Sequence, residues 1–168
     1  EYGCQFKERI AKFETFFLFA CFMGNAHVVE ELIAAGCSVD ELNVRRESGL
    51  VIAAKCRHFK VSKLLVKYNC KLNDTDCKEG WTALKWASYH GDVGTISILL
   101  LSGASLNVDD PSNSTPLMLA SMNGHFDCVK ILMKNDLETL DAVNEYGWSA
   151  LMLAANNNQV EVVRFLLD

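Results

Sequence analysis

Charged residues are few in this sequence, and it contains no long uninterrupted run of apolar residues. Charged residues make up 22% of the 168 residues and hydrophobic residues 50%, a balance that argues against intrinsic disorder. The net charge of −5 is mild and lacks the concentration of Lys and Arg that marks a nucleic-acid binder. The longest uninterrupted apolar run, Phe16 to Met23, is far shorter than the roughly 20 residues that cross a bilayer. We therefore expect neither nucleic-acid binding nor membrane insertion.

The motifs of common catalytic and metal sites are missing as well. No two cysteines have the CxxC spacing of a zinc knuckle or a thioredoxin-type site. The ten glycines are scattered singly, so none forms a phosphate-binding loop. No Ser-His-Asp order and no pair of catalytic carboxylates stands out. We expect that the chain is not an enzyme and that it uses no cofactor and no metal.

Seven cysteines are many for a chain of this length, and their number is odd. They are Cys4, Cys21, Cys37, Cys56, Cys70, Cys77 and Cys128. Several occupy positions that should be apolar, where a reduced thiol acts as a small hydrophobic side chain. No signal peptide opens the sequence. These features indicate an intracellular protein, either cytoplasmic or nuclear.

Five segments share one pattern, in which a Ser or Thr is followed two residues later by an apolar residue and five residues later by an alanine. The alanines are Ala20, Ala53, Ala87, Ala120 and Ala154, so the repeats are 33 or 34 residues apart. The residues four positions after these alanines are Gly24, Arg57, Gly91, Gly124 and Asn158. A period of this length predicts a solenoid of about five stacked units.

The physical chemistry of one unit follows from the same positions. The Ser or Thr is an N-cap, whose hydroxyl accepts a hydrogen bond from a free backbone amide of the first turn. Pro116 follows its cap at the first helical position, where a missing N–H does no harm. The first helix ends at the Gly, which adopts the left-handed conformation of a helix end at no steric cost, whereas Arg57 is less suited to it. A second helix follows, and it ends at Gly36, Asn69 or Gly103 before a polar stretch rich in turn residues.

These residues resemble a known family. The run Thr115–Pro116–Leu117 through Ala120, followed by Asn123–Gly124–His125, resembles an ankyrin repeat. So do Gly80–Trp81–Thr82–Ala83–Leu84 and the run from Ser102 to Asn107. The resemblance implies an all-α ankyrin-repeat solenoid, in which helix-turn-helix units are joined by β-hairpin-like loops.

The domain boundaries follow from the repeat. We expect an ankyrin repeat domain at 13–168, with units at about 13–45, 46–79, 80–112, 113–146 and 147–168. Residues 1–12 do not fit the pattern, but Phe6, Ile10 and Phe13 recur at helical spacing, which predicts an N-terminal capping helix or the remnant of a degenerate repeat. The last unit carries Met152 and Val162 with no polar replacement, so we expect further repeats or another domain to follow.

The resemblance implies that a partner binds on the concave side, which the hairpin tips and the exposed sides of the first helices form. The residues expected to contact the partner are Trp81, Tyr89, His90, Ser114, Met122, Asn123, Tyr146, Trp148 and Asn156. Trp and Tyr are enriched in binding hot spots, because they bury much area with few rotatable bonds. The centre is expected at Trp81, Tyr89, Met122 and Trp148. The alternative is that both Trp side chains pack on neighbouring hairpins and are structural.

One departure from the family pattern is systematic. The family usually has a His two residues after the Pro position, where it bonds to the cap and to the neighbouring loop. The residues at that position here are Leu18, Val51, Lys85, Met118 and Met152. We therefore expect an array that relies more on apolar contacts and is less stable than an idealised one. Trp86, Leu119 and Leu153 precede the repeat alanines and are expected in the core between helices.

Two further expectations come from the resemblance. His58 and His125 begin second helices, where the family commonly has a structural His. Asn73 and Asn107 end hairpin runs eight residues after Leu65 and Leu99, the spacing of Asn residues that an oxygen-sensing asparaginyl hydroxylase modifies in this family. The alternative is that the two Asn residues only make the turn.

The function expected from the resemblance is that of a protein–protein interaction module, a scaffold or adaptor that binds another protein or a peptide. Two alternatives stay open. The array could be the substrate-recognition part of a ubiquitin ligase, or a regulatory segment of a larger enzyme or channel. On its own this stretch of chain is expected to be monomeric.

Overall fold

A computed structural model describes residues 15–135 and 139–168, and all the regular secondary structure of those residues is helical. The helices are α2 (Phe16–Met23), α3 (Ala26–Ala34), α4 (Gly49–Lys55), α5 (Phe59–Lys67), α6 (Ala83–His90), α7 (Val93–Leu101), α8 (Pro116–Met122), α9 (Phe126–Asn135), α10 (Ala150–Asn156) and α11 (Val160–Leu167). Residues 1–12, with their predicted capping helix or repeat remnant, lie outside the described residues.

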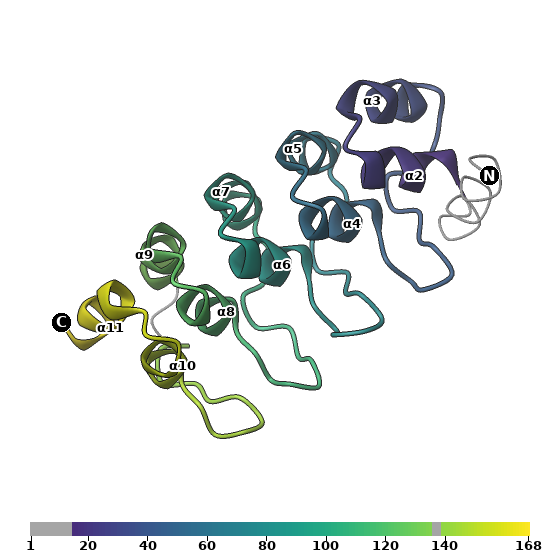
Figure 1. The fold of residues 1–168 in the computed structure, drawn as a ribbon. Coiled ribbons are helices and arrows are strands. Elements are labelled where there is room, and N and C mark those ends of the chain that lie inside the picture. The colour runs from purple at the N-terminus through teal and green to yellow at the C-terminus, as the bar shows by residue number, and fades with distance from the viewer. Residues whose placement is uncertain (1–14, 136–138) are drawn as a thin grey trace, which may run out of the picture.

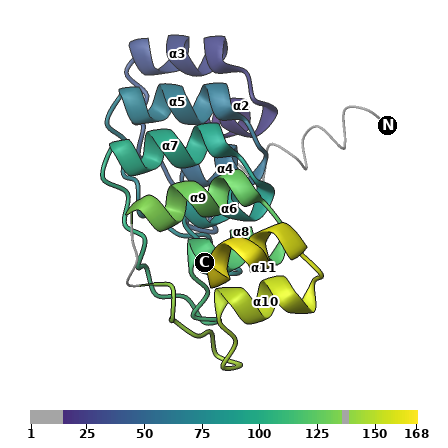
Figure 2. The ribbon, with the colours of Figure 1, turned by 90° about the vertical axis from the view of Figure 1, so that its left-hand side faces the viewer.

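Consecutive helices form pairs, and the pairs stack into a solenoid (Figure 1). The first helices α2, α4, α6, α8 and α10 make one row, and the loops between pairs project on their side (Figure 1). The second helices lie side by side in the other row, as Figure 2 shows. Isolated antiparallel bridges join Leu42 to Ser48 and Thr75 to Thr82 across two of the loops. The predicted all-α repeat solenoid is confirmed, while the exact unit boundaries stay a prediction.

Each first helix begins at the Ser or Thr that the repeat pattern predicts. The cap residues are Thr15, Ser48, Thr82, Thr115 and Ser149. Their hydroxyl oxygens accept a hydrogen bond from the backbone N–H three residues later, over distances from 3.2 to 3.5 Å. Pro116 stands at the start of α8 as predicted. The caps fix where each first helix starts and therefore which of its sides faces the loops.

The turn after each first helix passes through a residue in the left-handed backbone region. The φ angles are 74° at Gly24, 64° at Arg57, 74° at Gly91, 73° at Gly124 and 56° at Asn158. Arg57 adopts this conformation although it carries a Cβ, at a cost of roughly 1 kcal/mol relative to glycine.

Successive units are also joined by the side chains that begin the second helices. His58 Nε2 lies 2.9 Å from the carbonyl oxygen of Phe22 in the preceding unit, and His125 Nε2 lies 3.0 Å from that of Tyr89. The imidazoles pass directly over two glycines, since a Cβ on Gly24 would lie 2.5 Å from His58 Nδ1. The structural role predicted for these two His residues is therefore consistent with their contacts.

A continuous apolar core lies between the two helix rows. Its largest fully buried apolar side chains are Phe17, Leu18, Leu50, Leu65, Leu84, Ile96, Leu99, Leu117, Met118, Leu132 and Val29. Cys21, Cys70 and Cys128 are buried in the same layer, and burial raises their thiol pKa values to about 12, 12 and 11 respectively. These cysteines are unpaired, so they act as the small hydrophobic side chains that the sequence predicts.

Candidate protein-binding surface

The inner surface is defined here as the loop-facing side of α4, α6, α8 and α10 together with the loops that precede these helices (Figure 1). Eight of the nine predicted contact residues belong to α6, α8 and α10 or to the loops that precede them, and the ninth, Asn123, is the C-cap of α8. Tyr146 is 74% exposed and Trp148 38%, whereas Trp81, Tyr89 and Met122 are half-buried. Each of these aromatic rings is therefore at least partly accessible to a partner.

Four rings form one aromatic cluster on α6 and the residue before its cap: Trp81, Trp86, Tyr89 and His90. The Trp81 centroid lies 4.8 Å from that of Trp86 and 5.5 Å from that of Tyr89. The His90 imidazole stacks on Trp86 at 5.7 Å, with 24° between their planes. These distances are those of favourable aromatic pairs, so each ring restricts the motion of its neighbours.

Asp76 holds this cluster in place through hydrogen bonds to Trp81 and Trp86. Its side chain is fully shielded from solvent, and one of its oxygens accepts hydrogen bonds from the backbone amides of Glu79, at 2.9 Å, and Trp81, at 3.2 Å. The other oxygen accepts the indole N–H of Trp86 at 3.1 Å. One buried carboxylate thus fixes both the loop that carries Trp81 and the ring of Trp86.

Lys55 neutralises this carboxylate. Its ammonium group lies 3.4 Å from Asp76 and 3.1 Å from Glu47, and it sits 4.9 Å from the centroid of the Trp86 ring. Burial opposes the charged form, but the hydrogen bond and charge of Glu47 and those of Asp76 outweigh it and raise the pKa of Lys55. The ammonium group is therefore paired with two carboxylates of the protein, and its position over the Trp86 ring supports the aromatic cluster.

His90 is tied to the preceding unit. Its Nε2 lies 3.0 Å from the backbone carbonyl oxygen of Lys55, and because a carbonyl only accepts, Nε2 carries the proton. Burial is the main cause that lowers the pKa of His90 below its usual 6.5. The ring is consequently neutral at pH 7, and it contributes to positioning Trp86.

At the repeat position where the family has its His, this chain has Lys85, which forms an ion pair and not the apolar contact that we expected. Lys85 and Asp110 are bonded to each other, and their side chains are 2% and 0% exposed. Lys85 also donates to the carbonyl oxygen of Val108. The expectation of apolar contact holds for the buried Leu18, Val51 and Met118, whereas Met152 is 54% exposed. It is wrong for Lys85, which makes a polar bond from α6 to the following loop.

The same Asp110 organises the tip of its loop. It accepts hydrogen bonds from the backbone amide of Ser112 at 2.7 Å and the Ser112 hydroxyl at 2.6 Å. Burial opposes the ionised form, but the hydrogen bonds from Lys85 and Ser112 outweigh it and hold the pKa of Asp110 below its usual value. The Ser114 hydroxyl lies 2.7 Å from that of Ser112, so this predicted contact residue is part of the loop network.

The last loop presents its aromatics differently. The side-chain oxygen of Asn144 accepts hydrogen bonds from the backbone amides of Tyr146 and Trp148, each at 3.0 Å, and so holds the turn that carries these two exposed residues. Asn123 bonds back to the carbonyl oxygen of Leu119 at 3.0 Å, while Asn156 is exposed. The predicted residues therefore fall into a packed group on α6, a half-buried group at the two ends of α8 and an exposed group near α10.

We expected Trp86 in the core with Leu119 and Leu153. Leu119 is buried at 4% exposure, while Trp86 and Leu153 are half-buried and pack against the core. The membership of the Trp86 ring in the aromatic cluster was not predicted. Tyr89 and His90 stand three and four residues after Trp86, on one side of a helix, and this spacing could have indicated the cluster.

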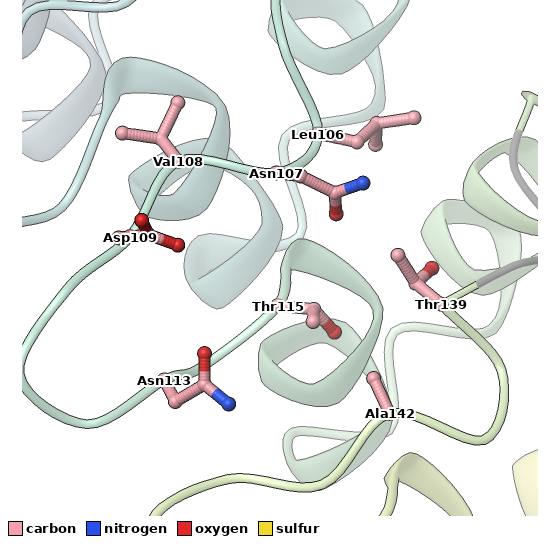
Figure 3. A pocket seen from close by; sticks show the side chains of 8 residues that line it. All are labelled: Leu106, Asn107, Val108, Asp109, Asn113, Thr115, Thr139 and Ala142. Atoms are coloured by element: carbon pink, nitrogen blue, oxygen red, sulfur yellow. The ribbon is translucent and has the colours of Figure 1, made fainter.

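A polar pocket of about 320 Å³ lies between the loops after α7 and after α9 (Figure 3). Asn107, Asp109, Asn113, Thr115 and Thr139 contribute its polar side chains (Figure 3). Asn113 crosses between the two loops, with its side-chain amide 2.9 Å from the carbonyl oxygen of Val143. The pocket offers hydrogen-bonding groups but none of the aromatic area that distinguishes the inner surface.

The two Asn residues discussed as modification sites are both exposed. Asn73 accepts the backbone amide of Ser105 in the next loop at 2.9 Å, which agrees with a role in the turn. Asn107 points into the polar pocket (Figure 3). Hydroxylation at either residue stays a prediction.

Within residues 15–135 and 139–168, no three His, Cys, Asp or Glu side chains lie together so that they could hold a metal ion. None of the helices of this part of the chain is long and apolar enough to cross a membrane.

The model of the family described as ankyrin repeats (3 copies) matches residues 17–110 and 94–168. The chain is 23% identical over 90% of its length to the probable E3 ubiquitin-protein ligase XBOS32 of Oryza sativa subsp. japonica, of which it covers 38%. It is 25% identical over 88% of its length to the E3 ubiquitin-protein ligase XBAT33 of Arabidopsis thaliana, of which it covers 35%.

A third relative is the ankyrin repeat and KH domain-containing protein CBG24701 of Caenorhabditis briggsae. The identity is 31% over 89% of this chain, which corresponds to 6% of that protein. The chain thus spans little more than a third of the two plant relatives and a small part of the nematode one.

Proposed function

Because this chain belongs to the ankyrin repeat family, whose domains are protein-interaction modules, we propose that it binds another protein or a peptide on its inner surface, as a scaffold or adaptor. The observation that carries the proposal is the aromatic cluster of α6, which Asp76 and Lys55 hold in place, together with the exposed Tyr146 and Trp148 in the loop before α10. Rings that are already held in place lose little entropy when a partner covers them.

The arrangement suggests a division of roles. Tyr146 and Trp148 lie on the more exposed part of the inner surface and would bury the most new area. Trp81 and Tyr89 would add further contact area, since they pack on each other and Asp76 holds the backbone of Trp81. Truncation of a hot-spot ring of this kind typically costs at least about 2 kcal/mol of binding free energy.

The test is capture of partners by the wild-type chain, by a variant that loses aromatic rings from the inner surface and by a control that loses an aromatic ring elsewhere. Trp81→Ala/Trp148→Ala removes two rings from the inner surface. Tyr68→Ala is the control, since Tyr68 is 36% exposed at the end of α5, in the row of second helices. A protein captured by the wild type and by Tyr68→Ala, but lost with the double variant at an unchanged thermal melt, supports the proposal. Equal capture by all three would refute it.

A second candidate function is substrate recognition for ubiquitylation. Two plant relatives that match most of this chain are named E3 ubiquitin-protein ligases, one of them as a probable one. In this case the inner surface would hold the substrate, and the ligase activity would belong to another part of the natural protein. The natural full-length protein, incubated with ubiquitin, its activating and conjugating enzymes and ATP, should modify the captured partner. An unmodified partner would contradict this candidate.

We further propose that this segment itself catalyses no reaction, that it is monomeric and that it works inside the cell. The net charge of −5 gives no support to nucleic acid as a partner. The free cysteines among the described residues suit a reducing compartment. Sedimentation equilibrium of the chain tests the monomer, and fluorescent tagging of the natural protein tests the compartment.

A further inference from the structure

Two arginines of the α4–α5 pair stand at positions where the other helix pairs have glycine or asparagine. Arg46, in the loop before α4, has φ 61°, and Arg57, in the turn after α4, has φ 64°. The residues at the position of Arg46 in the later loops, two before the helix cap, are Gly80, Asn113 and Gly147. Those at the position of Arg57 in the other turns are Gly24, Gly91, Gly124 and Asn158. All of these residues have positive φ, so the backbone conformation is general and only the arginine side chains are particular to this pair.

Both arginines strain the backbone without a return in packing. Glycine adopts the left-handed conformation freely and asparagine at small cost, whereas arginine is strained there. Arg46 and Arg57 are both exposed, so neither buries a side chain that would offset the strain. Strain that the fold does not require is concentrated at functional sites in proteins. The two side chains are therefore candidates for binding a ligand.

The loop tip holds Arg46 and its neighbour Arg45 in a fixed turn. The side-chain oxygen of Asn43 accepts hydrogen bonds from the backbone amides of Arg45 and Glu47, both at 2.9 Å. The Arg46 amide donates to the carbonyl oxygen of Asn43 at 2.8 Å. A turn that is already ordered lowers the entropy cost of binding through its side chains. Arg45, Arg46 and Arg57 are called the arginine patch here.

The arginine patch has no anionic partner in the described part of the chain, since none of its members forms an ion pair there. The nearby carboxylates of Glu47 and Asp76 are buried and paired with Lys55. At the tip of the next loop, Lys78 is paired with Glu79 at 3.0 Å. The three guanidinium groups are consequently available to an anion from outside.

The arginine patch borders the aromatic cluster. Burial is the main cause that lowers the pKa of His90, and the charge of Arg57 lowers it further, so this guanidinium lies near the imidazole. Helix α4 has seven residues and is about 10 Å long, so an extended segment of roughly three or four residues reaches from one end of the patch to the other. One ligand can therefore contact both the patch and the rings.

Exposed charges in the later loops have the opposite sign. Asp109 lies in the loop before α8, and Asp141 and Glu145 lie in the loop before α10. A long polyanion such as a nucleic acid, extended along the whole inner surface, would be repelled there. A short acidic segment at α4 avoids this repulsion, and the net charge of −5 agrees with a partner that is acidic only locally.

We propose that the arginine patch binds a short acidic segment of the partner, a run of Asp and Glu residues next to the apolar residues that cover the aromatic cluster. This inference rests on the proposed function, because it specifies the chemistry of the partner at one end of the inner surface. Guanidinium groups bind carboxylates through two parallel hydrogen bonds, which gives arginine an advantage over lysine at such a site.

Peptide selection tests this chemistry directly. A phage-displayed library of random dodecapeptides is selected on the immobilised 168-residue chain and on the variant Arg46→Gly/Arg57→Gly. The wild type should enrich peptides in which Asp and Glu lie beside aromatic or apolar residues. The variant should lose the acidic enrichment and keep the apolar one. No acidic enrichment on the wild type, or equal enrichment on both chains, would overturn the proposal.

Fluorescence anisotropy of the most enriched wild-type peptide provides the matched control. Arg46→Gly/Arg57→Gly should weaken binding at least about tenfold, while its melting temperature stays equal to or above that of the wild type because glycine relieves the strain. Lys60→Gln/Lys134→Gln removes the same charge from exposed positions on α5 and α9, in the row of second helices, and should bind as the wild type does. Equal losses in both variants, a lower melting temperature of the glycine variant, or tighter binding of an oligothymidylate than of the peptide would overturn the proposal.

The variant Trp81→Ala/Trp148→Ala separates this inference from the proposed function. Peptides without acidic enrichment that bind the wild type and not this variant would refute the arginine patch and leave the inner surface as the binding site. Acidic peptides that bind this variant as tightly as the wild type, and fail to bind Arg46→Gly/Arg57→Gly, would support the patch and refute the aromatic surface.

Discussion

Replacing Lys85 with methionine should destabilise the chain strongly, although methionine is the buried residue at the same repeat position in α8. Lys85→Met leaves Asp110 with a side chain that is 0% exposed and without its cation. Removing one partner of a buried ion pair typically costs about 3–5 kcal/mol. Ser112 still donates to Asp110, so we expect the lower end of that range.

A loss of about 3 kcal/mol corresponds to a fall of roughly 6–12 °C in the melting temperature of a chain of this size. Urea unfolding followed by circular dichroism at 222 nm measures the free energy. The double variant Lys85→Met/Asp110→Asn removes both charges and keeps an acceptor for Ser112, so it should recover more than half of the loss. Both variants carry the same methionine at position 85, so the difference between them isolates the cost of leaving the Asp110 carboxylate without its cation from the packing of that side chain.

The pH dependence gives an independent check. The lowered pKa of Asp110 contributes stability that is present above its unfolded-state pKa near 3.8 and is lost as the pH falls through the lower folded-state pKa. Without Lys85, burial raises this pKa instead, and the contribution of Asp110 to stability should increase as the pH falls toward 4. A Lys85→Met variant within about 0.5 kcal/mol of the wild type at pH 7 would refute the reasoning.

Three further predictions concern single positions. Arg57→Gly should stabilise the chain by up to about 1 kcal/mol in thermal unfolding, because glycine adopts the left-handed conformation without strain, whereas Arg57→Ala should bring no gain. The pKa of His90 is lower in the folded chain than in the unfolded one, so its stabilising contribution is present above pH 6.5 and is lost as the pH falls through the folded-state pKa. The urea midpoint of the wild type should therefore fall between pH 7.5 and pH 5.5, and that of His90→Gln should fall by less. Trp86→Phe should cost about 1–3 kcal/mol, since it leaves Asp76 without its indole donor, and near-ultraviolet circular dichroism should change accordingly.

Each of these has a contradicting outcome. A destabilised Arg57→Gly would mean that the arginine side chain makes contacts worth more than the strain. Urea midpoints of equal pH dependence in the wild type and in His90→Gln would show that another group titrates. A Trp86→Phe chain as stable as the wild type would show that the bond to Asp76 adds nothing net.

Much of the fold was predictable, because each repeat contains the residues that begin and end its own helices. The Ser and Thr caps, Pro116 and the glycines that follow the first helices act through local backbone chemistry, so their positions are enough to define the helix pairs. The all-α solenoid follows from stacking units that cannot bury their apolar faces alone.

The side chains between units were harder to predict, because their environment comes from the neighbouring unit. The partner of Lys85 is a carboxylate 25 positions away, and a single lysine in an apolar series gave no sign that this carboxylate would be buried beside it. Trp86 occupies a core position of the repeat, but it is only half-buried and its ring also packs against Trp81. Local patterns define the element, whereas volume and charge complementarity across the unit boundary decide where these side chains go.

The most direct measurement of the central proposal is the affinity of the captured partner for three versions of the chain by isothermal titration calorimetry. A surface centred on the inner aromatics predicts that Trp81→Ala/Trp148→Ala weakens binding by at least about 30-fold, which corresponds to roughly 2 kcal/mol. Tyr68→Ala should bind within threefold of the wild type, on the order of 0.6 kcal/mol. Equal affinities for the wild type and the double variant, both fully folded, would contradict the proposal that the inner surface is where the partner binds.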